Sequence, residues 1–381
     1  MSGDQATAVG VMCGSSLDGV DVVWLRGAEL LRFASQPLSR HVADHLRPAL
    51  LGVPLTAPEL AALDVAVART FVDAVRRSGS REAADFVACH GVTVGHNPAS
   101  GYSWQLGDLA TVARGLATTA VGHFRSLDVA GGGQGAPLAP LFHRLLFGES
   151  EEARLVLNLG GIANLSELPA GGGPRGYDLG PCNLLLDALH EQLTGGQGFD
   201  RNGRMARRGR ARADLLAPFL DDPFLRAPPP KSTGREQFGA DFAATFATTC
   251  TAAGCSPSDT LRTACHYVAA NVAEHVRRIA TANHWQRLIL CGGGCRNHTL
   301  VEEIGVAVAP LPVETTERHG IDPDAVEAVG FALLGDQCLR GVGQEVGPIT
   351  GGTGHPILGQ IQPGPGYPAL LRRLAASAAG H

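Results

Sequence analysis

The sequence predicts an α/β protein made of two similar halves. Its 381 residues are too many for one ordinary core and suit two domains, and apolar residues make up 44% of the chain. The segments Ala8–Leu25 and Arg154–Leu168 each consist of an apolar run, a small-residue turn and a second apolar run. This repetition indicates an internal duplication, and two such halves would place their turns across a cleft, where ligands commonly bind.

Apolar runs along the chain predict strands. Ala8–Met12, Asp21–Arg26 and Glu29–Ser35 are joined by short turns, which favours consecutive antiparallel pairing. The later run DFVACHGVTV is typical of a buried strand that leads into a polar loop. Gln286–Cys291 is another apolar run, and it leads into Gly292–Gly294 and then a predicted helix.

A helix is predicted to begin just after Thr56. The stretch TAPE, which starts at Thr56, has the spacing of a capping box with proline in the first helical turn. Apolar residues then recur at helical intervals until Gly79, and they mark one face of the helix: Leu60, Leu63, Val67, Phe71 and Val75.

Composition and charge exclude several classes of protein. The formal net charge is −5, so no basic surface for nucleic acid is expected, and no apolar run reaches the roughly 18 residues of a membrane helix. The N-terminus carries an acid and no base, unlike a signal peptide. The nine cysteines include no CxxC pair, so free buried thiols in a reducing cytoplasm are expected rather than a zinc or redox site.

The turn CGSSLDG, residues 13–19, is a candidate phosphate loop. Gly14 and Gly19 permit the turn, while backbone N–H groups and the hydroxyls of Ser15 and Ser16 supply hydrogen-bond donors. An elaborate hairpin is the structural alternative. The carboxylates of Asp18 and Asp21 would repel a phosphate unless Mg²⁺ lay between these carboxylates and the phosphate.

The segment CGGGCRN, which contains Gly292–Gly294, is a second candidate. A strand that ends in three glycines before a helix can place a phosphate or ribose at the helix N-terminus. The structural alternative is a tight strand-to-helix turn. No GxxxxGK[ST] motif occurs in the chain, so neither loop is a Walker A sequence.

Nine short motifs occur between about Gly10 and about Gly352: VMCGSSLDGVD, CHGVTVGHNP, WQLGD, FRSLDVAGGGQGAPLAP, LNLGGIANLS, YDLGPCN, PPKSTGREQF, CGGGCRN and DAVEAVGFALLG. In this order they resemble motifs of the anhydro-N-acetylmuramic acid kinases, in the actin/hexokinase/Hsp70 ATPase superfamily. The resemblance implies an α/β fold of two RNase H-like (actin-like ATPase) domains flanking a central cleft. It also implies domains at residues 1–130 plus about 340–381, and at 131–339.

The resemblance further implies a reaction. These kinases cleave the 1,6-anhydro bridge of anhydro-N-acetylmuramate and phosphorylate O6 with ATP and water, giving N-acetylmuramate 6-phosphate in cell-wall recycling. An inverting glycosidase needs two carboxylates, whereas here the γ-phosphoryl group captures the departing oxygen and one base suffices. The family's base corresponds to Asp178 in YDLGPCN. Without the resemblance, Asp178 would be interpreted as a turn residue before Gly180 and Pro181.

The same matches imply further site residues. Sugar contacts are expected from His90, Arg125 and Glu327, with Arg125 binding the muramate carboxylate through two donors. Taken alone, these three would be a core histidine, a surface ion pair and a solvated helix residue. Asp18 would hold Mg²⁺, through water. ATP would contact Gly14, Ser15, Ser16, Leu17, Asp18, Gly19, Val20, Asp21, Asn183, Gly292, Gly293 and Gly294.

The chain's single lysine, Lys231, lies in the motif PPKSTGRE. A contact with phosphate, a part in closing the cleft and a plain surface position all stay open for it. Five positions depart from the family's pattern: Cys13 replaces Ser, Ser15 replaces Thr, Val92 replaces Gln, His123 replaces Asp and Cys182 replaces Gly.

These departures leave the base in place and bear on the choice of sugar. A kinase for another 1,6-anhydrosugar such as levoglucosan is therefore an alternative, and so is a non-catalytic sensor that binds nucleotide or muropeptide. The expected partners are ATP and a small anhydrosugar, with neither nucleic acid nor membrane. A homodimer is compatible with the resemblance, because related kinases are often dimers.

Overall fold

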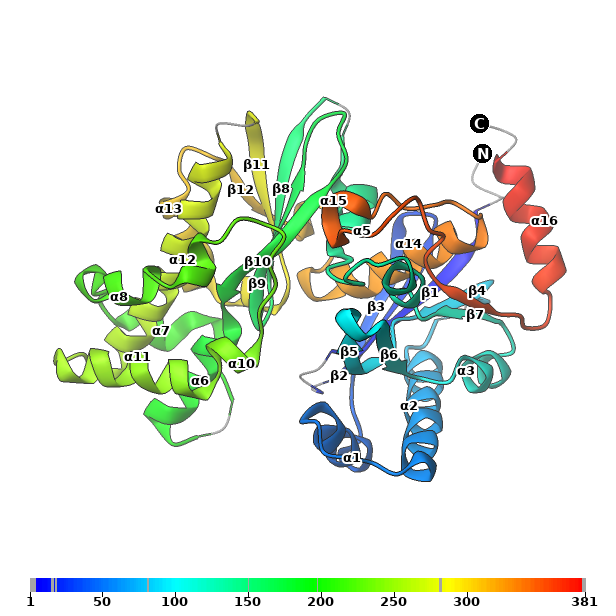
Figure 1. Ribbon diagram of the computed structural model, residues 1–381, viewed down its shortest axis with the longest axis horizontal. Coiled ribbons are helices and arrows are strands. Elements are labelled where there is room, and N and C mark those ends of the chain that lie inside the picture. The colour runs from blue at the N-terminus through cyan, green and yellow to red at the C-terminus, as the bar shows by residue number, and fades with distance from the viewer. Residues whose placement is uncertain are drawn as a thin grey trace. The chain divides into compact units, whose positions relative to one another are not determined.

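The computed structural model describes residues 5–14, 17, 19–80, 82–149, 151–196, 198–280 and 283–378. They form two units, shown in Figure 1: the first comprises Met1–Leu146 and Ala325–His381, and the second comprises Phe147–Asp324. The chain thus leaves the first unit later, and returns earlier, than the boundaries expected near residues 130 and 340. Helix α14 (Val326–Leu339) explains the difference, because it packs on β1, β2 and β4 of the first unit.

The first unit contains a six-stranded sheet with the order β13-β7-β4-β1-β2-β3. β1, β2 and β3 pair antiparallel in succession, as predicted, whereas β4 is parallel to β1 and β7 is parallel to β4. β5 and β6 form a separate hairpin. The strands are β1 (Thr7–Met12), β2 (Gly19–Arg26), β3 (Glu29–Pro37), β4 (Phe86–Cys89), β5 (Val92–Asn97), β6 (Tyr102–Leu106), β7 (Thr119–Gly122) and β13 (Gln360–Gln362).

The second unit contains a five-stranded sheet with the order β10-β9-β8-β11-β12. Three strands again pair antiparallel in succession, and β11 and β12 run parallel to β8. Both sheets therefore place the first strand centrally between the second and the fourth, which is the order of the RNase H-like fold. The expected duplication and α/β fold class are confirmed. The strands are β8 (Ala153–Leu159), β9 (Ile162–Leu168), β10 (Arg175–Pro181), β11 (Trp285–Cys291) and β12 (Val313–Thr315).

Helices cover both sheets. The predicted capping box is present, since Glu59 N donates to Thr56 Oγ1 and Thr56 N donates to the Glu59 carboxylate. In the first unit the helices are α1 (Arg40–Leu50), α2 (Ala57–Arg77), α3 (Leu109–Leu116), α4 (Ser126–Ala130), α5 (Ala139–Phe147), α14, α15 (Gly347–Thr350) and α16 (Tyr367–Ala378).

The second unit is richer in short helices, and α12 is its longest. No helix among the described residues is long and apolar enough to cross a bilayer. The helices are α6 (Asn183–Thr194), α7 (Arg204–Arg208), α8 (Ala217–Leu220), α9 (Pro223–Arg226), α10 (Arg235–Phe238), α11 (Ala240–Ala252), α12 (Pro257–Ile279) and α13 (His298–Ala307).

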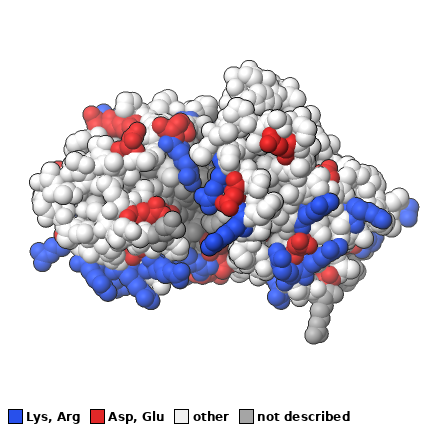
Figure 2. Space-filling view, turned by 90° about the horizontal axis from the view of Figure 1, so that it is seen from below, with Lys and Arg blue, Asp and Glu red and all other residues white. Residues whose placement is uncertain are grey.

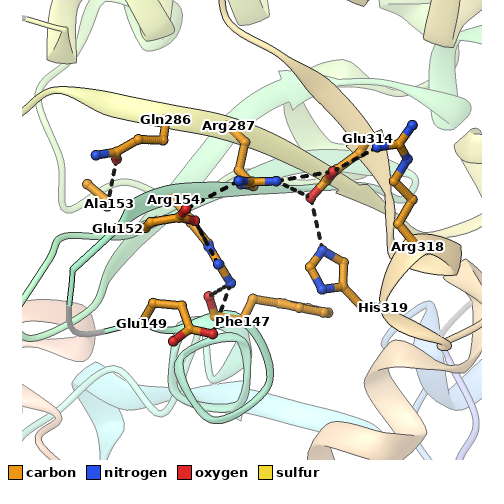
Figure 3. A network of polar contacts seen from close by, with 10 residues as sticks. All are labelled: Phe147, Glu149, Glu152, Ala153, Arg154, Gln286, Arg287, Glu314, Arg318 and His319. Carbon is orange, nitrogen blue, oxygen red and sulfur yellow. Dashed lines mark hydrogen bonds and ion pairs between the residues drawn. The ribbon is translucent and has the colours of Figure 1, made fainter.

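A polar network ties together the strands at one end of the second sheet (Figure 3). Arg287 on β11 lies between Glu152 and Glu314, at 3.3 Å and 3.4 Å. Arg154 on β8 donates to Glu152 at 2.7 Å, and His319 Nε2 contacts Glu314 at 3.0 Å. Because most of these groups are only partly exposed, the network is screened less by salt than a surface pair would be, and it fixes β12 to β8 through β11.

Net charge alone does not describe the surface. On the face seen in Figure 2, Lys and Arg side chains gather in bands while acidic residues are scattered, although the chain carries a formal net charge of −5. One short stretch of the second unit carries five exposed arginines: Arg201, Arg204, Arg207, Arg208 and Arg210.

Close contact between α14 and the first sheet depends on glycine. A Cβ atom on Gly10 of β1 would collide with the main-chain carbonyl of Ala328, and one on Gly330 would collide with the ring of Phe142. Phe142 in turn contacts Phe331 with ring centroids 5.7 Å apart. The absence of side chains at these two glycines therefore lets α14 and α5 pack in the first unit.

We expect Gly10→Ala to destabilise the protein by about 1–3 kcal/mol, because the new methyl group must displace main-chain atoms of α14. Gly305→Ala in α13 is the matched control, since nothing lies within 4 Å of the added atom. In a helix interior this change should stabilise by about 0.5–1 kcal/mol. Thermal and urea unfolding measure both effects, and an unchanged or raised midpoint for Gly10→Ala would contradict the packing.

Candidate active site

The turn between β1 and β2 is the predicted phosphate loop. Ser15, Ser16 and Asp18 lie outside the described residues. Leu17 has a left-handed backbone conformation with φ of 57°, its N–H donates to Gly14 O at 3.2 Å, and its side chain is buried. Leu17 therefore anchors the turn in the apolar core, and only its backbone can face a ligand.

The remaining residues predicted in this loop begin β2. Gly19 pairs with Pro37 and Asp21 pairs with Met12 and Ser35, so both lie within the sheet. Val20 is fully buried and contributes to the core, whereas the Asp21 side chain is partly exposed. Asp21 is thus the described carboxylate of this loop.

Three predicted sugar-side residues come together in the first unit. His90 follows β4, Arg125 precedes α4 and Glu327 lies in the first turn of α14. Arg125 Nε donates to His90 Nε2 at 3.0 Å, and Arg125 Nη1 donates to Gly135 O at 2.7 Å. The interpretation of Arg125 as half of a surface ion pair is therefore wrong, since two of its nitrogens are bound inside the unit.

Burial and charge fix the protonation states in this cluster. Burial, followed by the positive charge of Arg125, lowers the pKa of His90 to about 3, so the ring is neutral. Its Nε2 accepts from Arg125, and its Nδ1 donates to Gly91 O at 2.8 Å. Burial also lowers the pKa of Arg125 to about 10 and raises the pKa of Glu327. The negative charge of Glu327 acts to raise the pKa of Arg125, and the positive charge of Arg125 acts to lower the pKa of Glu327, so each charge partly offsets the effect of burial.

The loop beside this cluster depends on Asp128, which the sequence did not single out. Its buried carboxylate accepts from Gly135 N at 2.7 Å and from Thr350 Oγ1 at 2.9 Å. Gln134 N donates to Thr350 O at 2.9 Å. Asp128 therefore holds the glycine-rich loop that supplies the Arg125 acceptor Gly135.

Two departures from the family pattern take different places. Val92 is buried in the first unit's core, so its side chain is part of the packing. His123 has a left-handed backbone with φ of 52°, which is uncommon for a residue with a side chain. Burial lowers the pKa of His123, while the charges of Asp64 and Asp108 act to raise it.

Asp178 lies within β10 of the second unit, opposite Asn164 of β9. The interpretation as a turn residue is therefore wrong. The strand register shifts between Asp178 and Gly180, so Leu179 forms a bulge whose carbonyl accepts from Asn271 Nδ2 of α12 at 3.0 Å. Bulges are a common means of directing a side chain beside an active site.

The surroundings of Asp178 set its basicity. Thr233 N donates to Asp178 Oδ2 at 3.0 Å. Burial raises the pKa of Asp178 to about 6, the Thr233 N–H and the charge of Lys231 act to lower it, and the charge of Glu236 acts to raise it. A carboxylate with such a pKa is ionised at neutral pH and still accepts a proton readily, which suits a general base.

Asn183 and the three glycines gather around the turn between β8 and β9. Asn183 Nδ2 donates to Leu159 O at 2.9 Å, and a Cβ atom on Gly294 would lie 3.1 Å from Asn183 Oδ1. Gly292 has φ of 82°, a conformation that favours glycine, and its N–H donates to Pro323 O at 3.0 Å. Four of the residues predicted to contact ATP are therefore neighbours in the second unit.

A cavity of about 350 Å³ adjoins this glycine loop. Its lining includes Cys295 and Arg296 from the turn that follows β11, together with His298 and Val301 from α13. Arg296 is held by the carboxylates of Asp322, Asp324 and Glu317. No group of three or more His, Cys, Asp or Glu side chains among the described residues could hold a metal ion.

Comparison with known proteins identifies relatives of the whole chain. The sequence profile of a family described as anhydro-N-acetylmuramic acid kinase matches residues 6–364. The chain is 39% identical over 376 residues to such a kinase from Xanthomonas campestris pv. campestris (strain 8004), which covers 93% of this chain and 97% of that relative. It is 37% identical over 387 residues to one from Salinibacter ruber, covering 95% and 97%.

Solved structures resemble the chain more distantly. The activator of 2-hydroxyisocaproyl-CoA dehydratase from Clostridium difficile aligns with a TM-score of 0.46 and 13% identity, over 86% of this chain and 93% of that chain. A ROK family glucokinase from Streptomyces griseus aligns with a TM-score of 0.39 and 12% identity, over 86% and 98%. Similarity at this level carries no conclusion about substrates.

Asp178 should make stability depend on pH. Because its pKa is about 6 in the folded state and ordinarily 3.8, its contribution to stability is complete below about pH 3.8 and is lost as the pH rises through about 6. Asn cannot ionise and can still accept from Thr233 N. We therefore expect Asp178→Asn to gain on the order of 2 kcal/mol relative to the wild type between about pH 4 and pH 7.5.

Urea unfolding of both proteins at the two pH values measures this difference. The same stability difference at both values would show that Asp178 is not held in an environment that opposes its charge.

Proposed function

Because the chain belongs to the anhydro-N-acetylmuramic acid kinase family, we propose that it opens the 1,6-anhydro ring of 1,6-anhydro-N-acetylmuramic acid and phosphorylates O6. Water and ATP are the co-substrates, and N-acetylmuramate 6-phosphate and ADP are the products. Such a reaction belongs to the recycling of cell-wall amino sugars. The nine cysteines, all present as free thiols, fit a reducing compartment, and we propose the cytoplasm.

The observation that supports this reaction best is the position of Asp178. In the proposed step, Asp178 takes a proton from water as the water oxygen attacks C1 of the sugar. The C1–O6 bond breaks, and O6 forms a bond to the γ-phosphorus of ATP as ADP leaves. Since the phosphoryl group captures the leaving oxygen, no second carboxylate has to protonate it. A single base with a pKa of about 6 meets this requirement at neutral pH.

The cluster of His90, Arg125 and Glu327 is proposed to bind the sugar. Arg125 Nε and Nη1 are already bound to His90 and to Gly135, which leaves Nη2 for the substrate carboxylate in place of the two donors expected from the sequence. A buried guanidinium is a strong partner for a carboxylate. Burial raises the pKa of Glu327, and we propose that its carboxyl group shares a hydrogen bond with a sugar hydroxyl.

For ATP we propose the turn at residues 13–21 and the glycine loop around Asn183. The backbone N–H groups of such turns suit phosphate oxygens, and the cavity beside Gly292–Gly294 suits the nucleoside. Mg²⁺ would neutralise triphosphate charge. It commonly binds through one or two carboxylates, phosphates and water, and we propose that Asp18 holds it through water.

We expect Asp178→Asn to abolish ring opening and phosphoryl transfer together, because the two are one event in this mechanism. Loss of a general base typically costs about 10²–10⁴-fold in rate. Both products can be followed by NMR with ATP present and absent. Ring opening by the variant without ATP would refute the assignment of the base, and a folded variant is expected from the stability analysis.

Arg125→Met is expected to lower kcat/KM for anhydro-N-acetylmuramate by about 10–100-fold, because a charged hydrogen bond to the sugar carboxylate is lost. Levoglucosan lacks that carboxylate and serves as the matched control substrate. The ratio of the two kcat/KM values should therefore collapse in the variant. An equal fall for both sugars would show that Arg125 does not bind the carboxylate, and equal wild-type rates would favour a broader anhydrosugar kinase.

A further inference from the structure

Lys231, the only lysine of the chain, lies inside the second unit on the segment between α9 and α10. Its Nζ donates to Phe224 O at 2.9 Å and to Leu225 O at 3.2 Å, and it contacts His275 Nε2 at 3.1 Å. Its ammonium also lies over the Phe224 ring, 4.6 Å from the centroid. These contacts occupy the three donors of the ammonium, so Lys231 is held as a structural cation rather than left to reach a phosphate.

The same segment holds Asp178 from two sides. Asp178 N donates to Lys231 O at 3.2 Å, and two residues later Thr233 N donates to Asp178 Oδ2 at 3.0 Å. The position of the carboxylate therefore depends on the path of residues 231–233. The ammonium of Lys231 ties that path to α9 and to α12 through its three contacts.

Helix α12 completes the arrangement. Burial lowers the pKa of His275 to about 4, so its ring is neutral, and its Nδ1 donates to Asn271 O at 3.0 Å. His275 Nε2 is then an acceptor for Lys231 Nζ. One turn earlier, Asn271 Nδ2 donates to Leu179 O in the bulge. α12 thus holds both the bulge next to Asp178 and the lysine beneath it.

We propose that Lys231, held by His275, is a positioning residue that sets both the geometry and the basicity of Asp178. The proposal rests on the proposed function, in which Asp178 is the base. In this role Lys231 acts through Asp178 and Thr233 and not by binding a substrate.

Several charged groups face this site. Arg278 and His275 come from α12, Asp222 precedes α9, Asp178 lies on β10, and Glu236 of α10 faces Asp178. Burial, followed by the charge of Arg278, lowers the pKa of Lys231 to about 8, and the charges of Asp178 and Asp222 act to raise it. Lys231 is therefore charged at neutral pH and loses its charge only slightly above it.

A bell-shaped pH profile of kcat follows for the wild type. Activity should rise as Asp178 ionises at about pH 6. It should fall as Lys231 loses its proton at about pH 8, because a neutral amine has one donor fewer for its three contacts and holds residues 231–233 less firmly. Lys231→Arg keeps a charge that is not lost in this range, so the alkaline fall should disappear. Lys231→Met removes the charge at every pH, so the alkaline limb should disappear and the acid limb should move up by about one pH unit, which lowers kcat about fivefold at pH 6.

KM for ATP should change by less than about twofold in both variants, because a positioning residue acts on the base rather than on nucleotide binding. A uniform loss of kcat in Lys231→Met, with both limbs unmoved, would overturn the proposal and leave a merely structural role. An alkaline limb retained in Lys231→Arg would overturn it as well.

NMR titration tests the proposal without relying on activity. Lysine-specific ¹⁵N labelling gives one side-chain signal in the intact wild type. The titration midpoint of this signal should lie at about pH 8 and not at the ordinary 10.5. In the wild type and Lys231→Met, carboxyl ¹³C signals should show the Asp178 midpoint shifted upward in the variant. A lysine midpoint near 10.5, or an unmoved Asp178, would refute the coupling. Failure of the wild type to phosphorylate any anhydrosugar would instead refute the proposed function alone.

Discussion

The central constraint in the second unit is a carboxylate that must stay reactive while partly withdrawn from water. A direct ion pair would depress the pKa of Asp178 and weaken it as a base. No ion pair among the described residues includes Asp178, and the nearby ammonium of Lys231 is directed instead at two main-chain carbonyls and a neutral imidazole. The charge of Lys231 acts on Asp178 without a direct contact between the two side chains, and the backbone N–H of Thr233 donates the direct hydrogen bond. The pKa of the Asp178 carboxylate therefore stays close to neutral pH, at about 6.

The two units share one strand order but present different functional groups. In the first unit, the segments after β4 and β7 and the start of α14 bring a neutral imidazole, a guanidinium and a carboxyl group into contact. In the second unit, β11 takes the place that β4 has in the first, and the turn after β11 carries Gly292–Gly294, while Asn183 follows β10. The repeated sheet provides the same scaffold twice, and side chains from outside the sheet decide what each copy does.

Much of the fold follows from local sequence. The first three strands, their antiparallel pairing and the capped helix α2 were predictable because each depends on neighbours within a few residues. The domain boundaries were not, since they depend on where α14 packs. Asp178 was open to misinterpretation because Gly180 and Pro181 are typical of a turn, whereas pairing with β9 keeps that segment in a strand.

The site was predictable only where the family motifs reach. His90, Arg125 and Glu327 come from distant parts of the chain, and no local pattern indicates that they meet. Thr233 contributes a backbone N–H, which any residue but proline could supply, so the sequence carries no signal for it. The contacts of Lys231 with His275 and of Asp128 with Thr350 join residues 44 and 222 positions apart, and only tertiary packing reveals them.

The distribution of reactive side chains has a practical consequence for handling the molecule. Amine-reactive linkers would react with a single side-chain amine, that of Lys231. Because Lys231 belongs to the segment that holds the proposed base, immobilisation through lysine would perturb the reaction. Eight of the nine thiols are buried, and Cys255, in the turn between α11 and α12, is partly exposed. A single fluorophore coupled by maleimide at Cys255 would report on this protein while leaving its amine in place.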